Sequence, residues 1–520
     1  MSILKYLLST IVLLMLLACS QNNIELKNYT KEKTIKPYKN SPILKKIHKT
    51  DKKISNKSAF YPLSLPTDAF ASRVFLIDNA KKTIDIQYYI YENDTIGKIF
   101  SAHLILASKR GVKVRILLDD LSTAGKDKNL IELASLKNIE LKLFNPNILR
   151  SSFRNMALLL NINSLGKRMH NKAVIADGVS AIVGGRNIGD VYFASNSGTI
   201  FLDYDILAIG SVLPKLNREF STYWNSKESI SYKKILNKNS NDTHILSTEV
   251  LTSAINKFNK TPIGKAIKNS KFNRQIVKDN LLLTVADETN LYYDHPSKVS
   301  SDENNNTLHI SSQLGKNIED IKSDVIIISP YFIPSKEMIN ALKRVRKKGV
   351  KVVVVTNSLS STDVMPVYAG YQGYIKSLVS MGVELYELKS DSFKKLLKKK
   401  KIKNIPSISL HTKMTIVDDD KIVIGSANMD PRSNKLNTEI VMVIKSKKIV
   451  KQQREELSKI INLKNFYKLS WAKHPSNNYG IVWTTIEQNQ KKLYYKVPNT
   501  SIFKKLTTDI ISLLPIKGYL

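Results

Sequence analysis

A short polar motif that occurs twice is the feature that most constrains how this chain can fold. The motif has the pattern H-x-K-x-x-x-x-D, and its two copies read MHNKAVIAD and LHTKMTIVD. The copies contribute these polar residues: His170, Lys172 and Asp177, then His411, Lys413 and Asp418. With 8 histidines in the chain, one chance match to this spacing is expected on the order of 0.05 times. Two matches therefore indicate an internal duplication.

The residues around each motif repeat as well. Fifteen and seventeen residues after each histidine the two halves have Gly185 and Asn187, and Ser426 and Asn428. Before each motif, an apolar run that ends in aromatics leads into a helix-like stretch, a glycine and a second apolar run, as in SDVIIISPYFIPSKEMINALKRVRKKGVKVVVV. This order predicts parallel βαβ units, with Gly111 and Gly349 just past the ends of their helices.

The duplication predicts the architecture. We expect an α/β protein made of two similar βαβ sandwich halves, related by a pseudo-twofold axis, with the active site at their interface. The first half is placed at residues 59–245 and the second at residues 246–470. Residues 471–520 are expected to form a C-terminal appendage with an amphipathic tail, either docked on the body or lying on a membrane surface.

Two His-x-Lys pairs that face each other suit a phosphodiester substrate. Residues two apart on a strand point to the same face, so each histidine is expected beside its lysine. One imidazole would attack phosphorus, while the other protonates the leaving oxygen and then deprotonates the incoming alcohol or water. The lysines, with Asn187, Ser426 and Asn428, would hold the non-bridging oxygens. No carboxylate cluster with metal-ligand spacing accompanies the motifs, so neither a metal ion nor another cofactor is expected.

A carboxylate beside the far nitrogen would orient each imidazole. Glu439, in LNTEIVMVI, is the candidate for His411. Asp205, in LDYDILAIG, aligns with it in the repeat and is the candidate for His170, with Asp203 as its rival.

The aspartates of the two motifs have a different expectation. Asp177 is followed by glycine and Asp418 by two further aspartates, so both are placed near turns. We expect structural roles for them, through the backbone or a basic neighbour.

The N-terminus indicates export. An apolar stretch follows Lys5 and ends in LLAC, where Cys19 is the single cysteine of the chain. This pattern resembles the lipobox of bacterial lipoproteins, in which cleavage precedes a lipidated cysteine. We therefore expect a signal peptide at residues 1–18, lipidation of Cys19, a polar lysine-rich tether at residues 19–58, and attachment to a membrane of the bacterial envelope, facing the periplasm or the exterior.

The paired motifs resemble those of the phospholipase D superfamily. Segments such as IDIQYYIYENDTIG, VGGRNIGDVYF and HTKMTIVDDDKIVIGSANMDPRSNKLNTE are similar to the bacterial cardiolipin synthase C-type subgroup. The resemblance implies the phospholipase D fold and a phosphatidyl-histidine intermediate, with His170 as the nucleophile and His411 as the acid and base, or the reverse. It also implies phospholipid substrates, with phosphatidylglycerol as acceptor and another phospholipid, such as phosphatidylethanolamine, as donor.

The same residues are also compatible with two other functions. The same histidines would serve a hydrolytic phospholipase D that releases phosphatidic acid. The net charge of +37 suits any polyanion, so a nuclease is a third reading, although the export signal counts against nucleic acid. The sequence does not indicate whether the protein works with an accessory protein.

Overall fold

The computed structural model describes residues 34–47, 56–147, 166–195, 198–236, 247–302, 306–312, 314, 321–392 and 407–513. The predicted signal peptide and Cys19 lie outside these residues, as does the lysine run FKKLLKKKKIKN before the second motif. In the part of the chain that is described, no helix is long and apolar enough to cross a membrane.

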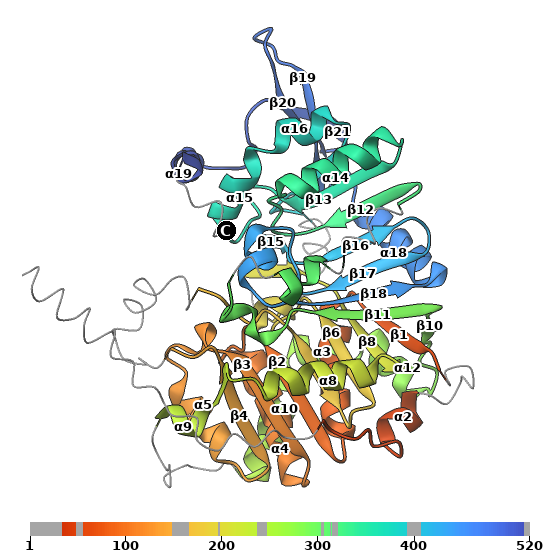
Figure 1. Ribbon diagram of the computed structural model, residues 1–520, viewed down its shortest axis with the longest axis vertical. Coiled ribbons are helices and arrows are strands. Elements are labelled where there is room, and N and C mark those ends of the chain that lie inside the picture. Colours follow the sequence, from red (N-terminus) through yellow and green to blue (C-terminus); the bar gives the residue numbers. More distant parts are fainter. Residues whose placement is uncertain are drawn as a thin grey trace, which may run out of the picture.

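The strands of the first sheet lie in the order β10-β1-β8-β6-β5-β2-β3-β4-β9 (Figure 1). Their bounds are β1 Ser58–Leu63, β2 Thr83–Tyr88, β3 Lys113–Asp119, β4 Ile139–Phe144, β5 Ala173–Ala176, β6 Ser180–Gly184, β8 Asp205–Gly210, β9 Ser229–Ser231 and β10 Thr284–Val285. The helices of this lobe are α2 Pro42–Ile47, α3 Pro66–Asn79, α4 Thr95–Lys109, α5 Asp127–Ser135, α8 Leu213–Trp224, α9 Tyr232–Leu236, α10 Thr248–Lys260, α11 Pro262–Lys268 and α12 Lys271–Val277.

The strands of the second sheet lie in the order β11-β18-β17-β16-β12-β13-β14-β19-β20-β21. Their bounds are β11 Glu288–Tyr293, β12 Asp324–Ile328, β13 Lys351–Asn357, β14 Glu384–Leu388, β16 Met414–Val417, β17 Lys421–Gly425, β18 Ile440–Lys445, β19 Phe466–Lys473, β20 Tyr479–Glu487 and β21 Gln490–Tyr494. The helices are α14 Lys336–Lys347, α15 Met365–Gln372, α16 Ile375–Ser380, α18 Lys447–Ile460 and α19 Ile502–Leu513. A small separate sheet joins β7 Thr199–Leu202 to β15 Ser407–Leu410.

The strand orders demonstrate the duplication. The run β1-β8-β6-β5-β2-β3-β4-β9 in the first sheet corresponds strand by strand to β11-β18-β17-β16-β12-β13-β14-β19 in the second. In both, the three strands linked by helices are parallel and the others antiparallel. Gly111 and Gly349 follow α4 and α14 with φ of +88° and +83°, a backbone conformation that glycine adopts without a steric penalty. The predicted α/β fold of two similar halves is therefore confirmed.

The predicted boundary between the halves is too early in the chain. Helices α10, α11 and α12 pack against α3 and α4 of the first lobe, with Leu251, Phe258 and Phe272 buried in the core of that lobe, and β10 pairs with β1. The second repeat starts only at β11. These helices belong to the first lobe because their apolar residues cover α3 and α4. The predicted boundary did not take this packing into account.

Both ends of the chain also differ from the prediction. The tether was expected to extend to residue 58, but Ile43 and Ile47 of α2 are buried in the first lobe. The appendage was expected from residue 471, but β19 starts at Phe466 and pairs with β14, so β19, β20 and β21 continue the second sheet. Helix α2 packs against α3, and β19 pairs with the backbone groups of β14 that would otherwise form the edge of the sheet.

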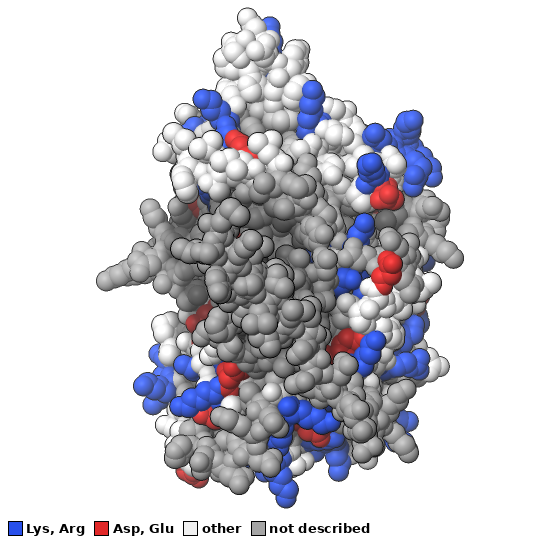
Figure 2. Space-filling model, turned by 60° about the vertical axis from the view of Figure 1, so that its left-hand side comes forward, with Lys and Arg blue, Asp and Glu red and all other residues white. Residues whose placement is uncertain are grey.

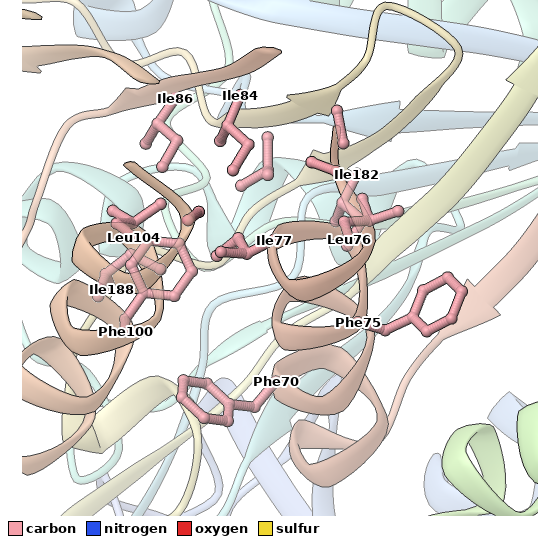
Figure 3. Close-up of a cluster of buried hydrophobic side chains, with 14 of the residues drawn as sticks. Phe70, Phe75, Leu76, Ile77, Ile84, Ile86, Phe100, Leu104, Ile182 and Ile188 are labelled. Atoms are coloured by element: carbon pink, nitrogen blue, oxygen red, sulfur yellow. The ribbon is translucent and has the colours of Figure 1, made fainter. Parts of the chain in front are cut away.

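The hydrophobic core has three parts. Figure 3 shows the first, in which Phe70 and Leu76 of α3 and Phe100 of α4 pack on Ile84 and Ile86 of β2. A second part lies on the outer side of the second sheet, under α14, α15 and α16.

The third part of the core draws residues from both lobes. Phe220 and Trp224 of α8 belong to the same buried cluster as Met442 of β18 and Val450 of α18. Each such side chain contributes about 1.5–3 kcal/mol when fully buried. The two lobes are therefore joined by continuous apolar packing, which holds their facing loops in register.

Candidate active site

The first of two backbone contacts between the lobes brings the second motif to the first lobe. Strands β7 and β15 pair in parallel, with Leu202 opposite Leu410. The His411 N–H donates to the Leu202 carbonyl at 2.7 Å. The residue after Leu202 is Asp203, so this ladder delivers Asp203 and His411 to the same point.

The second contact is the symmetric counterpart. Met169 and Thr438 form a parallel bridge, in which the His170 N–H donates to the Thr438 carbonyl at 2.8 Å. The Thr438 N–H donates to the Arg168 carbonyl, also at 2.8 Å. Glu439 follows Thr438, so this bridge delivers Glu439 to His170.

Each imidazole is thus paired with a carboxylate of the other lobe. Nδ1 of His170 lies 2.9 Å from Oε2 of Glu439, and Nδ1 of His411 lies 2.6 Å from Oδ2 of Asp203. All of these side chains are buried, with exposed fractions of 7% and 1% in the first pair and 5% and 0% in the second. A carboxylate at Nδ1 fixes the ring orientation and leaves Nε2 for chemistry.

The predicted pairing of histidines and carboxylates is therefore wrong. We expected Glu439 beside His411 and Asp205 beside His170. The strand register gives the reason, because Gly184 pairs with Asp205 in the first lobe whereas Gly425 pairs with Val441 in the second. Asp203, two residues earlier, is the structural counterpart of Glu439.

Asp205 has a different partner set. Its carboxylate lies 2.9 Å from Arg73 and 3.1 Å from Arg186, and all three side chains are buried. Asp205 therefore holds the base of the first lobe together and does not contact either catalytic imidazole.

The motif lysines lie in matching positions. Nζ of Lys172 donates to the His170 carbonyl and Nζ of Lys413 to the His411 carbonyl, both at 2.5 Å. Burial lowers the pKa of Lys172 to about 7 and that of Lys413 to about 8, and the positive charge of Lys413 also lowers the pKa of Lys172. The two motifs are thus electrostatically coupled at one site.

The imidazoles are neutral at physiological pH. Burial lowers the pKa of His170 to about 4, against the opposing effect of the Glu439 carboxylate. Burial and Lys413 hold the pKa of His411 well below its usual value, and a charge on His170 lowers it further.

The two His–carboxylate pairs are not equivalent. His170 and Lys172 lower the pKa of Glu439 despite its burial, so this carboxylate is ionised and accepts a hydrogen bond from Nδ1–H of His170. Burial raises the pKa of Asp203. Nδ1 of His411 also lies 3.0 Å from Nζ of Lys413, a group that only donates. The geometry thus favours a lone pair on Nε2 of His170 and a proton on Nε2 of His411.

Besides the lysines, three residues were expected to bind phosphate oxygens, and two of these three have other partners. The Ser426 hydroxyl donates to Glu439 at 2.5 Å, and its oxygen accepts a hydrogen bond from the Ile440 N–H at 3.0 Å. The Asn187 side chain accepts from the Ile90 N–H at 3.1 Å and donates to Tyr192 at 2.8 Å. These residues position the site, because their short side chains lie within reach of backbone groups.

Asn428 is the exception. Its side-chain oxygen is buried and has no hydrogen-bond partner within the described residues. A buried amide oxygen without a partner is costly, so Oδ1 of Asn428 is available to a hydrogen-bond donor of a ligand.

The motif aspartates hold turns. Asp177 and Asp418 have φ of +53° and +51°. Asp177 accepts backbone N–H groups from Lys81, Lys82 and Thr83, and Asp418 accepts those of residues 322–324. Each carboxylate ties its hairpin to the start of a parallel strand, in keeping with the structural roles expected for them.

Aromatic rings around the imidazoles were missed. The Tyr89 ring centroid lies 5.0 Å from that of His170, while Tyr192 and Phe201 lie 5.2 and 5.0 Å from His411. Among these residues, Tyr89 had a signal in the sequence, because it belongs to the aromatic ending of the strand before α4. These rings exclude water from the imidazoles, and this burial contributes to the low pKa values of His170 and His411.

Comparisons with known proteins agree with this geometry. A model of the family described as "Cardiolipin synthase, PLD-like domain" matches residues 74–224 and 314–461, which include both motifs. The chain belongs to this cardiolipin synthase family of phospholipase D-like proteins. Both the recognition from the motifs and the predicted enzyme class are thereby confirmed.

Two relatives of this cardiolipin synthase family member cover most of its length. Cardiolipin synthase C of Escherichia coli is 34% identical over 464 residues, 88% of this chain and 96% of the relative. An uncharacterised protein of Helicobacter pylori is 34% identical over 470 residues, 88% of this chain and 89% of the relative.

A solved structure shows the fold. The phosphatidylserine synthase of Haemophilus influenzae Rd KW20 superposes with a TM-score of 0.56 at 13% identity, covering 90% of this chain and 98% of that one. The phospholipase D fold predicted for this family member is confirmed.

Proposed function

We propose that this protein is a membrane-tethered phosphatidyltransferase that makes cardiolipin, joining a phosphatidyl group to the free hydroxyl of phosphatidylglycerol. The crossed pairing of His170 with Glu439 and of His411 with Asp203 carries the proposal. It supplies one oriented base and one oriented acid beside two lysines, which is what exchange at a phosphodiester requires. The similarity to cardiolipin synthase C supports the choice of lipids.

The first step forms a covalent intermediate. Nε2 of His170 attacks phosphorus, and the bond from phosphorus to the headgroup oxygen of the donor breaks. Nε2 of His411 gives its proton to that oxygen while Nδ1 takes a proton from Asp203, whose pKa is raised by burial, so the His411 ring stays neutral. The ionised Glu439 stabilises the positive charge that the His170 ring gains. Lys172 and Lys413 are placed to balance the charge on the non-bridging oxygens.

The second step returns the site to its starting state. Nε2 of His411 takes the proton from the hydroxyl of phosphatidylglycerol, whose oxygen attacks phosphorus as the bond to His170 breaks, and Nδ1 of His411 returns its proton to Asp203. The assignment of His170 as nucleophile rests on the ionised Glu439 beside it and on the Lys413 contact to Nδ1 of His411.

A lipid assay tests the reaction. Purified protein is incubated with vesicles of phosphatidylglycerol, with and without phosphatidylethanolamine, and the lipids are separated. We expect cardiolipin as the product, and none with His170→Asn. If phosphatidic acid alone forms, the protein is a hydrolytic phospholipase D; if plasmid DNA is cleaved and lipids are not, it is a nuclease.

Trapping of the intermediate tests the roles of the two histidines. With phosphorus-labelled phosphatidylglycerol, His411→Asn is expected to accumulate acid-labile label on the protein. The reason is that the loss of His411 slows the second step, which needs it as a base, more than it slows the attack by His170. His170→Asn is expected to carry no label. Label on His170→Asn and none on His411→Asn would reverse the two roles.

The membrane tether is a separate part of the proposal. Lipidation of Cys19 would attach the chain to a membrane of the bacterial envelope. A Cys19→Ala protein is expected to lose its acyl chains, detected by mass, and to shift toward the soluble fraction. An unchanged mass and unchanged fractionation would contradict the tether.

A further inference from the structure

The last helix of the described chain, α19, has apolar side chains on its exposed face and a polar side chain on its buried face. In α19, Ile502, Phe503, Leu506, Ile510 and Leu513 are exposed by 88, 79, 57, 56 and 85%. The polar Thr508 is fully buried instead. At 100° per residue the five apolar side chains lie within about a 100° arc. The helix thus presents one continuous apolar stripe to the outside.

Contacts with the body account for only the opposite face. Helix α19 packs against α15, on its outer side at the periphery of the second lobe (Figure 1). In α15, Ala369 and Gly370 are buried, and small residues of this kind allow close approach of two helices. The apolar stripe faces away from this contact, and a stripe of this size on a solvent-facing helix marks an interaction surface.

Helix α19 is also linked to the active site. The loop just before α15 holds Asp363, whose carboxylate accepts a hydrogen bond from the Tyr331 hydroxyl at 2.7 Å. The Tyr331 ring in turn lies 6.0 Å from Nζ of Lys413. One helix therefore separates the apolar stripe from residues that contact the second motif.

The charge of the chain indicates which partner covers this stripe. The net charge is +37, and α19 itself carries Lys504 and Lys505 against the single acidic residue Asp509. Figure 2, turned so that the left-hand side of Figure 1 comes forward, shows more Lys and Arg than Asp and Glu side chains. Lys505 and Asp509 lie beside one edge of the stripe, and Lys504 lies on the opposite, half-buried face. The attraction to an anionic bilayer therefore comes from the positive charge of the chain as a whole, and the apolar stripe is the part of α19 that can enter the headgroup region.

We infer that α19 is an interfacial membrane helix, whose apolar stripe inserts into the phospholipid surface that supplies the substrate. This inference rests on the proposed function for the identity of that surface. It assigns α19 the role of holding the second lobe against the bilayer, in addition to any attachment at the N-terminus.

Site-specific fluorescence in the full chain tests insertion without measuring activity. Phe503→Trp is mixed with vesicles of phosphatidylglycerol and brominated phosphatidylcholine, with Val277→Trp as control because Val277 is 83% exposed on α12 of the first lobe. We expect at least about twofold quenching at position 503 above the wild-type background, and none at position 277. Equal quenching at both positions, or none at 503, would overturn the inference.

A second comparison separates this inference from the proposed function. The Leu506→Asn, Ile510→Asn double variant is compared with Val277→Asn, Leu282→Asn, which also changes exposed apolar residues. We expect the first to lose about tenfold or more in turnover on vesicles and to keep turnover in detergent micelles. Quenching at 503 without turnover in either lipid form would retain the inference and refute the proposed function.

A second copy of the chain is the competing occupant. If sedimentation shows that the wild type is a dimer and the double variant a monomer, with vesicle binding unchanged, the stripe is a dimer interface and the inference is wrong.

Discussion

Glu439 of the second lobe lies 2.9 Å from Nδ1 of His170 in the first lobe, and the pair is almost completely buried. Its symmetric counterpart joins Asp203 to His411. The imidazole of each motif therefore depends on the opposite lobe for its orientation. This arrangement places the proposed reaction at the interface between the lobes.

The carboxylates are expected to matter as much as the histidines. Glu439→Gln and Asp203→Asn should each reduce turnover by roughly 10²- to 10⁴-fold, because a neutral amide neither holds the tautomer nor stabilises the charged ring. Steady-state rates on phosphatidylglycerol measure the effect. Glu384→Gln, at a surface ion pair with Lys468, is the control and should stay within a factor of two; similar losses in all three would contradict the assignment.

Asp205→Asn is expected to affect stability first. The substitution leaves Arg73 and Arg186 buried without their shared carboxylate, and breaking a buried pair of this kind costs about 3–5 kcal/mol. The free energy of unfolding in urea measures it. Were Asp205→Asn as stable as the wild type but inactive, Asp205 would have a direct role in the reaction.

The pH dependence of kcat/KM should report the buried lysine. The pKa of Lys172 is about 7, so its positive charge is present below that pH and is lost as the pH rises through it. Activity is therefore expected to fall from neutral to alkaline pH. Lys172→Arg keeps its charge, and whatever activity it retains should decline only at higher pH; an identical alkaline limb would rule out Lys172.

The acid limb of the same profile should report His170. Its pKa of about 4 means that the ring binds a proton and loses its nucleophilic lone pair only as the pH falls toward 4. Activity is expected to persist at pH 5, where an imidazole with an ordinary pKa near 6.5 would be mostly protonated. Loss of kcat/KM with a midpoint near 6.5 in a protein that is still folded would contradict this.

Gly185→Ser is expected to inactivate the first half of the site. A Cβ at Gly185 would lie 2.2 Å from Oδ1 of Asp203, so the carboxylate must move away from His411. The equivalent Ser426 is tolerated because its hydroxyl donates to the longer Glu439. Turnover should fall at least about 10²-fold, and full activity would show that Asp203 can shift without cost.

Much of the fold was readable because it is duplicated. Two copies of the same spacing around His170 and His411 imply two copies of the same strands, and helix-ending glycines such as Gly349 mark the βαβ units. The turn-forming roles of Asp177 and Asp418 followed from the residues after them. Such features are local, so the sequence displays them directly.

The partner of each imidazole was decided by tertiary structure alone. In the sequence, Asp205 and Glu439 align by their neighbouring leucines, whereas the hairpin register makes Asp203 the equivalent of Glu439. Two residues along a strand return to the same face, so both alignments satisfied the apolar pattern. The crossing itself comes from β7 pairing with β15 and from Met169 pairing with Thr438.

The sequence by itself thus determined that the chain is a duplicated α/β protein with a paired His-Lys site. Only the tertiary structure decided which carboxylate serves which histidine and where the first lobe ends. The physical reason is the same in both cases. Pairing between strands far apart in the chain, and the covering of one lobe's apolar surface by α10, α11 and α12, depend on contacts that no local pattern encodes.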